Sequence, residues 1–154
     1  QQLVILTSIG RLFKFDLSNK YINPSTKQSQ GLLLINLLPL ERVISCCKSE
    51  EKGILYLISK KGKFFQLQIN DIYDAHNSKL GYVNEKIQLK NDHFIKIHPD
   101  NQYIDIETNK NKSARLNFSK VAFNSSKNSL KIDFLNLEKD EYLENCSRLD
   151  KFIN

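Results

Sequence analysis

Residues 4–15, with the sequence VILTSIGRLFKF, decide the fold, because the same arrangement returns twice along the chain. The stretch consists of an apolar strand, a hydroxyl residue, a tight turn, a cation and a second strand. Copies lie at 56–67 (YLISKKGKFFQL) and 105–116 (DIETNKNKSARL). The turn position steps from 10 to 62 and then to 111. A strand repeat of this length predicts blades or a repeat array rather than one closed core.

A second motif follows each copy of the first. Residues 38–43 (LPLERV), 89–94 (LKNDHF) and 137–142 (LEKDEY) share a Leu, two variable residues, an acid, one variable residue and a large apolar residue. Each repeat is therefore expected to hold a hairpin, a loop, a third strand, an acidic turn and a fourth strand. The recurring acids, Glu41, Asp92 and Asp140, indicate a structural role such as accepting N–H bonds of the turn.

The residues at the tight turns fit a hairpin. Gly10 and Gly62 adopt positive φ at little cost, and Asn111 is the next best residue for that conformation. Apolar residues alternate in the flanking strands and are expected to form the blade core: Phe13, Phe15, Phe64, Phe65, Leu67 and Leu116. The tail from Lys139 to Phe152 could be a short helix or part of an acidic turn, and the sequence leaves this open.

Length and composition are ordinary for a soluble globular domain. A chain of 154 residues with 40% hydrophobic and 26% charged residues has room for about three blades. We expect repeats at about 1–50, 51–100 and 101–148, with an acidic tail region at 138–154. No apolar run approaches the roughly 18 residues needed to span a membrane. The chain opens directly into a strand without a Met, so we expect it to be a fragment of a longer protein.

Charge is distributed unevenly. The net charge is +6, with 19 Lys and 4 Arg among the basic residues, while residues 138–154 alone carry three basic and five acidic residues. A basic body indicates a polyanionic partner, of which nucleic acid is the commonest. The plain alternative is a compositional bias toward Lys, Asn and Ile, as expected from an AT-rich genome.

The cysteine and histidine residues do not form a reactive or metal-binding set. Cys46 and Cys47 are adjacent, Cys146 stands alone, and no pair has ligand spacing, so a zinc site is not expected. Cys46 is expected on a buried strand as a small hydrophobe, and three cysteines without a framework suit a reducing cytosol. His98 and Asp100 belong to a turn sequence without a nucleophile motif, so no catalysis and no cofactor are predicted.

The repeat resembles the C-terminal domain of the A subunits of DNA gyrase and topoisomerase IV. Residues 7–14 (TSIGRLFK) are similar to the opening of that family's blades, and 59–63 and 108–115 look like further copies. The family's following segment, a Gly before a strand and then Leu-x-x-acid, matches 31–41 and 81–92, with a Gly-less version at 129–140. The resemblance covers nearly the whole chain.

The resemblance implies a β-pinwheel, a propeller-like disc of four-stranded blades with a basic rim that bends duplex DNA. This chain would be a non-catalytic DNA-wrapping part of a type IIA topoisomerase in a bacterial or plastid cytoplasm, at the nucleoid. Its partners would be duplex DNA, the rest of the A subunit and the ATPase B subunit, with no cofactor and no membrane. Family domains usually have five or six blades, so three repeats imply an excised portion or a reduced, open arc.

One motif of the family is not matched. Gyrase carries a Q-[KR]-R-G-G-[KR]-G box that anchors wrapped DNA, and the nearest segment here, 27–31 (KQSQG), lacks the doubled Gly. The chain therefore either derives from blades beyond the box or is similar to topoisomerase IV or a divergent paralogue.

Basic residues near the turns and inter-strand loops are the candidate phosphate contacts, which would give affinity without base readout. The alternative for each is a solvated turn residue. Two other functions stay open: a propeller-type protein-interaction module, and an enzyme on a propeller scaffold, which would need acids or His gathered at blade centres. The candidate DNA-binding residues are Arg11, Lys27, Lys60, Lys61, Lys63, Lys79, Lys110, Lys112 and Arg115.

Overall fold

The computed structural model describes residues 1–18, 35–75, 80–84, 87–99, 103–117, 129–130 and 137–148. These residues form strands and one short 3-10 helix, η1 (Ile69–Asp71). The strands are β1 (Gln2–Thr7), β2 (Leu12–Asp16), β3 (Val43–Ser49), β4 (Ile54–Ser59), β5 (Phe64–Gln68), β6 (Phe94–Pro99), β7 (Tyr103–Thr108), β8 (Ser113–Asn117), β9 (Ser129–Leu130) and β10 (Leu143–Arg148).

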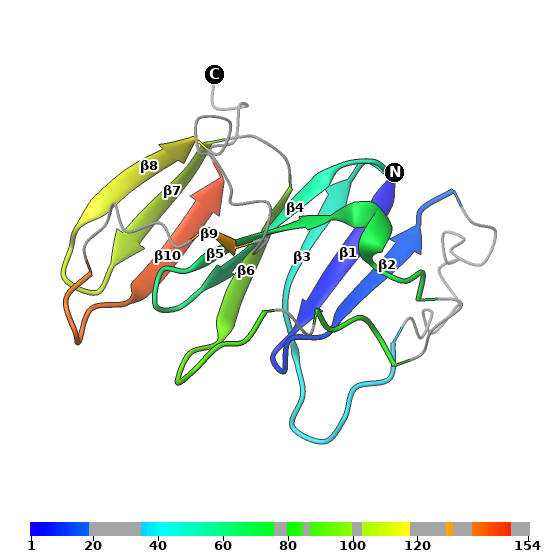
Figure 1. The fold of residues 1–154 in the computed structure, drawn as a ribbon, viewed down its shortest axis with the longest axis horizontal. Coiled ribbons are helices and arrows are strands. Elements are labelled where there is room, and N and C mark those ends of the chain that lie inside the picture. Colours follow the sequence, from blue (N-terminus) through cyan, green and yellow to red (C-terminus); the bar gives the residue numbers. More distant parts are fainter. Residues whose placement is uncertain are drawn as a thin grey trace, which may run out of the picture.

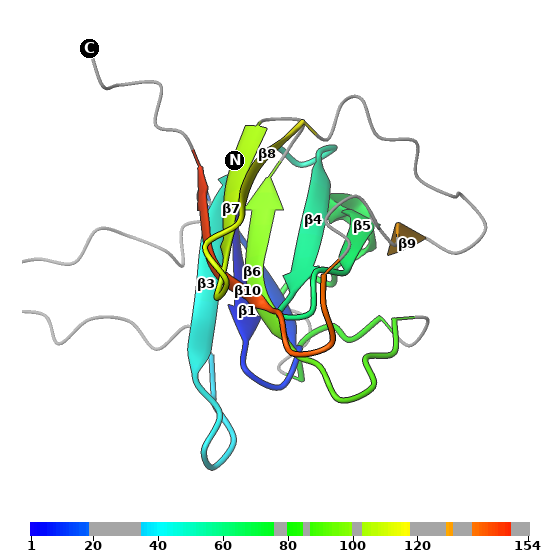
Figure 2. The same ribbon diagram turned by 90° about the vertical axis from the view of Figure 1, so that its left-hand side faces the viewer.

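The strands form three antiparallel sheets that stand side by side along the molecule (Figure 1). We call them blade 1 (β2-β1-β3), blade 2 (β6-β4-β5-β9) and blade 3 (β10-β7-β8). Seen along the row, the three sheets lie roughly one behind another (Figure 2). The predicted all-β architecture of about three pinwheel-like blades is confirmed.

Each blade begins with the hairpin that the repeat predicts. The turn residues Gly10, Gly62 and Asn111 have φ values of 85°, 83° and 61°. Their N–H groups donate to the carbonyl of the hydroxyl residue three positions earlier, at 3.0–3.1 Å. Because Gly and Asn adopt this left-handed conformation most readily, the same chemistry closes all three hairpins.

The fourth strand of a blade comes from the following repeat. Tyr82, in the second repeat, forms an isolated antiparallel bridge to Leu12 at the edge of blade 1, and β9, in the third repeat, pairs with β5 of blade 2. Gly81 has φ 74°, and a Cβ there would lie 2.8 Å from Cζ of Phe13. The sequence predicted the strand segments but not this exchange, so blade boundaries and repeat boundaries differ.

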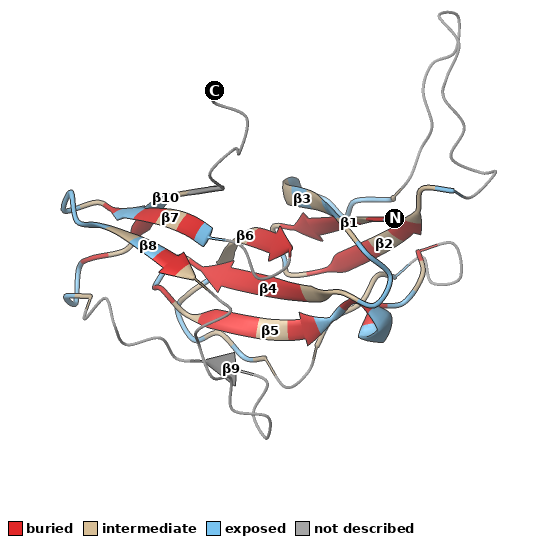
Figure 3. Cartoon of the chain, turned by 90° about the horizontal axis from the view of Figure 1, so that it is seen from above, coloured by how far each residue is buried: buried red, intermediate tan, exposed pale blue. Residues whose placement is uncertain are grey.

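Apolar layers between neighbouring blades form the core. One layer joins Val4, Leu6 and Leu12 of blade 1 to apolar residues of β4 and β5. A second joins blade 2 to blade 3. The predicted core residues are all buried (Figure 3). The residues of the second layer are Tyr56, Ile58, Phe64, Ile104, Ile106, Leu116 and Leu143.

One expectation from the sequence was wrong, and one question that the sequence left open is answered. In the described part of the predicted tail region, residues 138–148 form a turn and the edge strand β10 of blade 3 and not a helix. Cys46 lies on β3 but is exposed rather than buried. Alternation along an edge strand turns every second residue outward, and Cys46 falls on the outward set.

Candidate nucleic-acid interface

The recurring turns meet along one edge of the row of blades. We call this the turn edge and define it by the hairpin turns 7–11, 59–63 and 108–112 and the acidic turns 38–42, 89–93 and 138–142. All six lie at the lower side in Figure 1. In each blade, one backbone hydrogen bond joins the two turns. These bonds run from the N–H groups of Ser8, Lys60 and Asn109 to the carbonyls of Arg42, His93 and Tyr142, at 2.8, 2.9 and 3.1 Å.

This pairing corrects the alignment of the third repeat. Because Tyr142 occupies the place of Arg42, the residue equivalent to Glu41 is Glu141 and not Asp140. Glu41 and Glu141 are both buried, and each carboxylate accepts the hydroxyl of the Thr in the facing hairpin turn, at 2.6 and 2.8 Å. The predicted structural role of the acids therefore holds, with Glu141 in place of Asp140.

In blade 1, the candidate Arg11 is part of a buried ion pair. Its guanidinium donates two hydrogen bonds to the Glu41 carboxylate, one of them 2.8 Å long from Nε. It also donates to the carbonyls of Leu80 and Asn36, at 3.1 and 3.0 Å, and only 8% of the residue is exposed. Arg11 therefore ties three loops together and has no free face for a phosphate, contrary to its interpretation as a DNA contact.

The Glu41 carboxylate is held ionised by this arrangement. The hydrogen bond from Arg11 lowers its pKa to about 2, against an opposing effect of burial, and the hydroxyl of Thr7 and the N–H of Leu38 add to the lowering. The Leu38 N–H donates to Oε1 at 2.8 Å. Glu41 thus stabilises its own turn through Leu38 and the facing hairpin turn through Thr7.

In blade 2, the acid accepts hydrogen bonds from backbone N–H groups and forms no ion pair with the lysines in the described residues. Asp92 is one methylene shorter than Glu, and its Oδ1 accepts the N–H groups of Lys61 and His93, at 3.1 and 2.8 Å. The N–H of Lys63 donates instead to the hydroxyl of Ser59, at 3.0 Å. Within the described residues, no ion pair involves the lysines of this blade's turns, which are Lys60, Lys61, Lys63 and Lys90.

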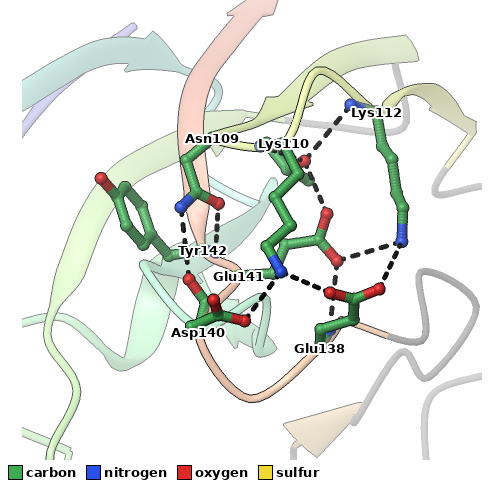
Figure 4. A network of polar contacts seen from close by, with 8 residues as sticks. Asn109, Lys110, Lys112, Glu138, Asp140, Glu141 and Tyr142 are labelled. Carbon is green, nitrogen blue, oxygen red and sulfur yellow. Dashed lines mark hydrogen bonds and ion pairs between the residues drawn. The ribbon is translucent and has the colours of Figure 1, made fainter.

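In blade 3, the lysines of the hairpin turn are bound by carboxylates (Figure 4). Lys110 Nζ contacts both Glu138 and Asp140, the latter at 2.8 Å. Lys112 Nζ lies 3.4 Å from Glu141 and 4.0 Å from Glu138. These hydrogen bonds raise the pKa of Lys110, with that from Asp140 the largest contribution.

The carboxylates of blade 3 respond in the opposite direction. The hydrogen bond from Lys110 lowers the pKa of Asp140. For Glu141, burial acts to raise the pKa, but the hydrogen bonds from Thr108, from the N–H of Glu138 and from Lys112 together lower it. The lowered pKa values keep Asp140 and Glu141 ionised at neutral pH, where they compete with any external anion for the two lysines.

The nine predicted DNA contacts thus fall into five groups. Arg11 is buried, Lys27 and Lys79 lie outside the described residues, and Lys60, Lys61 and Lys63 are together on blade 2. Lys110 and Lys112 are paired on blade 3. Arg115 is not on the turn edge, because it lies on β8 and pairs with Asp105 at 2.8 Å.

Sequence reasoning missed three exposed cations on the turn edge. Arg42, Lys90 and Lys139 lie in the acidic turns of blades 1, 2 and 3, and all three are exposed. They lie within two residues of the recurring acid, and the motif was interpreted from its acid alone. Net charges of the paired turns follow from the sequence: +1 in blade 1, +3 in blade 2, where four lysines face one carboxylate, and zero in blade 3.

Other chemistry finds little support in the described residues. They contain no group of three or more His, Cys, Asp or Glu that could hold a metal ion. None of the three cysteines, all of which lie in the described residues, forms a disulfide, and burial raises the pKa of Cys146 to about 11, which keeps it a thiol. In the described part of the chain, no helix is long and apolar enough to cross a membrane.

The fold defines a class of protein. Small antiparallel blades in a row form a β-pinwheel, and this chain has that fold, with blades 1 and 2 each paired to a segment of the next repeat. Solved structures with the same fold include the C-terminal domain of DNA gyrase A (TM-score 0.67, 19% identity) and the C-terminal domain of DNA topoisomerase IV (TM-score 0.66, 17% identity). A third is the E. coli ParC C-terminal domain (TM-score 0.60, 17% identity).

These matches cover the chain almost completely but only part of the matched structures. The topoisomerase IV, gyrase A and ParC domains align with 96%, 97% and 95% of this chain, and the aligned part is 45%, 49% and 61% of their own lengths. The chain therefore spans about half of a domain of this type. No protein-family model and no curated protein matches the sequence.

Proposed function

We propose that this chain binds duplex DNA without sequence preference and bends it, as a non-catalytic accessory part of a type IIA topoisomerase A subunit. The observation that carries the proposal is the lysine cluster of blade 2. Four lysines share two adjacent turns, and within the described residues none is neutralised by a carboxylate. The shared fold with gyrase A and topoisomerase IV domains supports the same function.

The mechanism is electrostatic. Lysines that neutralise phosphates release condensed counterions, which gives affinity with little dependence on sequence. Lys61 and Lys90 are exposed, while Lys60 Nζ lies 4.5 Å from the ring centre of Tyr142, a residue of blade 3. Bending a 20–30 base-pair site costs roughly 1–6 kcal/mol, so contacts beyond this cluster are required. Arg42 supplies one, and Lys27 and Lys79 stay predicted contacts.

Other parts of the topoisomerase would catalyse the reaction. Cleavage, religation and ATP hydrolysis would belong to the rest of the A subunit and to the ATPase B subunit, which we propose as partners. The role of the present chain would be to hold a bent duplex near them, in the cytoplasm at the nucleoid.

The proposal is tested by fluorescence anisotropy with a short random-sequence duplex over a range of salt concentrations. We expect a linear fall of log affinity against log salt, with a slope of about 0.9 per phosphate engaged. The variant Lys61→Gln/Lys63→Gln/Lys90→Gln should lose most of the affinity and lower the slope. The matched control Lys110→Gln/Lys112→Gln/Arg115→Gln removes the same three charges and should lose less. Equal losses would contradict a site on blade 2.

A protein-interaction module is the second candidate function, and the acidic turn of blade 1 favours it. Leu38 and Leu80 are 54% and 80% exposed, and Leu40 is fully exposed with φ 66°. An apolar residue held outward in a left-handed conformation indicates a contact surface. This function would take first place if no DNA binding is found at low salt, and Leu40→Asn would then weaken binding of the partner protein.

A further inference from the structure

The chemistry of equivalent sheet faces differs among the three blades, and this difference is separate from that of the turn edge. Within β1, β4 and β7, residues alternate between a face directed to the preceding blade and a face directed to the following blade. We call the second the outer face. The hairpin registers place equivalent residues in the three blades. Counted from the recurring hydroxyl residue, the outer-face positions are Val4, Leu6 and Leu12 in blade 1, Tyr56, Ile58 and Phe64 in blade 2, and Asp105, Glu107 and Ser113 in blade 3.

The outer faces of blades 1 and 2 form the two apolar layers of the core. Val4 and Leu6 have no exposed surface and pack on residues of blade 2. Tyr56 is 1% exposed, and Ile58 and Phe64 have no exposed surface, because they pack on blade 3. An apolar outer face is therefore how this array attaches one blade to the next.

The outer face of blade 3 has the opposite chemistry. Its strand pairs are Asp105 with Arg115 and Glu107 with Ser113. The Asp105 carboxylate accepts a hydrogen bond from Arg115 Nε at 2.8 Å, and the Arg115 side chain is 55% exposed. Glu107 and Ser113 are exposed, and Asn145 of β10 completes a polar surface across the sheet. In Figure 3, β7 and β8 carry exposed positions where β1 and most of β4 are buried.

The opposite face of blade 3 is ordinary. Ile104, Ile106 and Leu116 are 0%, 2% and 6% exposed and pack on blade 2, as the equivalent residues of blade 2 pack on blade 1. The change from apolar to polar is therefore confined to one face of one blade. A general loss of packing or a general bias in composition would change both faces of blade 3, and only one face is changed.

We propose that blade 3 is a capping blade whose outer face accepts no further blade, so that the row ends there as an open arc. A blade packed on this face would remove the hydration of Asp105, Glu107 and Arg115 and would find no apolar partners. Repeat arrays end in units with a polar outer face for this reason. Chain that follows blade 3 is compatible with the cap, provided that it does not stack a blade on this face.

Thiol accessibility tests the cap directly. Glu107→Cys and Ile58→Cys place a thiol at equivalent outer-face positions, and alkylation of each is followed by peptide mass spectrometry in the full-length polypeptide encoded by the gene. We expect the thiol at position 107 to react as fast as the exposed native Cys46, and the thiol at position 58 to react at least tenfold more slowly. Equal protection at positions 107 and 58 would overturn the proposal.

A graft of blade 2 chemistry provides the second test. Asp105→Tyr/Glu107→Ile/Ser113→Phe gives blade 3 the outer face of blade 2, and sedimentation velocity should show association that the wild-type chain lacks. The control Asp105→Asn/Glu107→Gln removes charge without adding apolar surface and should stay monomeric. Association of the wild-type chain that this control abolishes would show that the face is an interface. Neither test involves DNA, so the outcome does not depend on the proposed function.

Discussion

The paired turns of blades 2 and 3 share one backbone design and treat their lysines in opposite ways. In both, a hairpin turn closed at Gly62 or Asn111 lies against an acidic turn through one backbone hydrogen bond. In blade 2 the single carboxylate, Asp92, is used on backbone N–H groups. In blade 3 three carboxylates hold Lys110 and Lys112. The number and length of the acids decide whether the lysines of the hairpin turn are paired with carboxylates in the described residues.

Blade 1 extends the comparison to a buried pair. There the carboxylate of Glu41 holds a guanidinium that is nearly inaccessible, and the network connects the hairpin turn to the carbonyls of Asn36 and Leu80. The hairpin turn and the acidic turn of the repeat thus form a structural ion pair in blade 1, a charged surface in blade 2 and a neutralised surface in blade 3. Four predictions test this division, and the first concerns blade 1.

Glu41→Gln should produce the largest change. It leaves the Arg11 guanidinium buried without a counter-charge, and breaking a buried ion pair costs about 3–5 kcal/mol. Thermal or urea unfolding followed by circular dichroism measures the loss. Asp92→Asn in blade 2 is the matched control and should cost much less, since no lysine depends on that carboxylate for neutralisation. A similar loss in both variants would contradict the division between blades 1 and 2.

The same ion pair predicts how stability depends on pH. The pKa of Glu41 is lowered to about 2 in the folded chain, whereas an unfolded Glu titrates near 4.3. Its contribution is therefore complete above roughly pH 5 and is lost as the pH falls toward about 2, because the unfolded chain binds the proton first. The wild-type chain should lose more stability over this window than Glu41→Gln does. Parallel curves for the two proteins would show that Glu41 is not the titrating group.

Much of the fold could be predicted from the sequence, because it rests on local chemistry. The three hairpins follow from Gly10, Gly62 and Asn111, and the buried strand residues follow from alternation. The exchange of the fourth strand could not be predicted, since the pairing of Leu12 with Tyr82 joins residues of different repeats.

The candidate site was less predictable, for a physical reason. A cation four residues after the hydroxyl residue has the same local sequence context in every repeat, whether it is Arg11, Lys63 or Lys112. Its availability depends on a carboxylate about thirty residues away, and the sequence 137–142 offers acids at two adjacent positions. The backbone hydrogen bond from the N–H of Asn109 to the carbonyl of Tyr142 sets how the two turns align. In this alignment Glu141 faces the hairpin turn and Asp140 pairs with Lys110.

Neutralising Glu138 and Asp140 should make the paired turns of blade 3 resemble those of blade 2 in charge. Glu138→Gln/Asp140→Asn keeps the side-chain shapes and releases Lys110 to solvent. We expect DNA affinity at low salt to rise by about tenfold and the log–log salt slope to steepen by about 0.9 for one added phosphate contact. Anisotropy measures both quantities. The further variant Lys110→Gln in this background should cancel the gain, and a gain that persists would reflect net charge instead of this lysine.

The reciprocal change is a single substitution in blade 2 with the smallest expected effect. Asn91 occupies the place of Asp140 and has φ 52°, which Asp also tolerates, so Asn91→Asp should leave the fold unchanged. Asp140 pairs with Lys110 from the equivalent turn position of blade 3, so we expect the new carboxylate to pair with Lys61. Exposed ion pairs are worth about 0.2–1 kcal/mol, so affinity for DNA should fall by roughly two- to fivefold at low salt. Screening should remove most of this difference at high salt. An unchanged affinity would mean that Lys61 does not contact the duplex, and the DNA path would then have to run through Lys63 and Lys90.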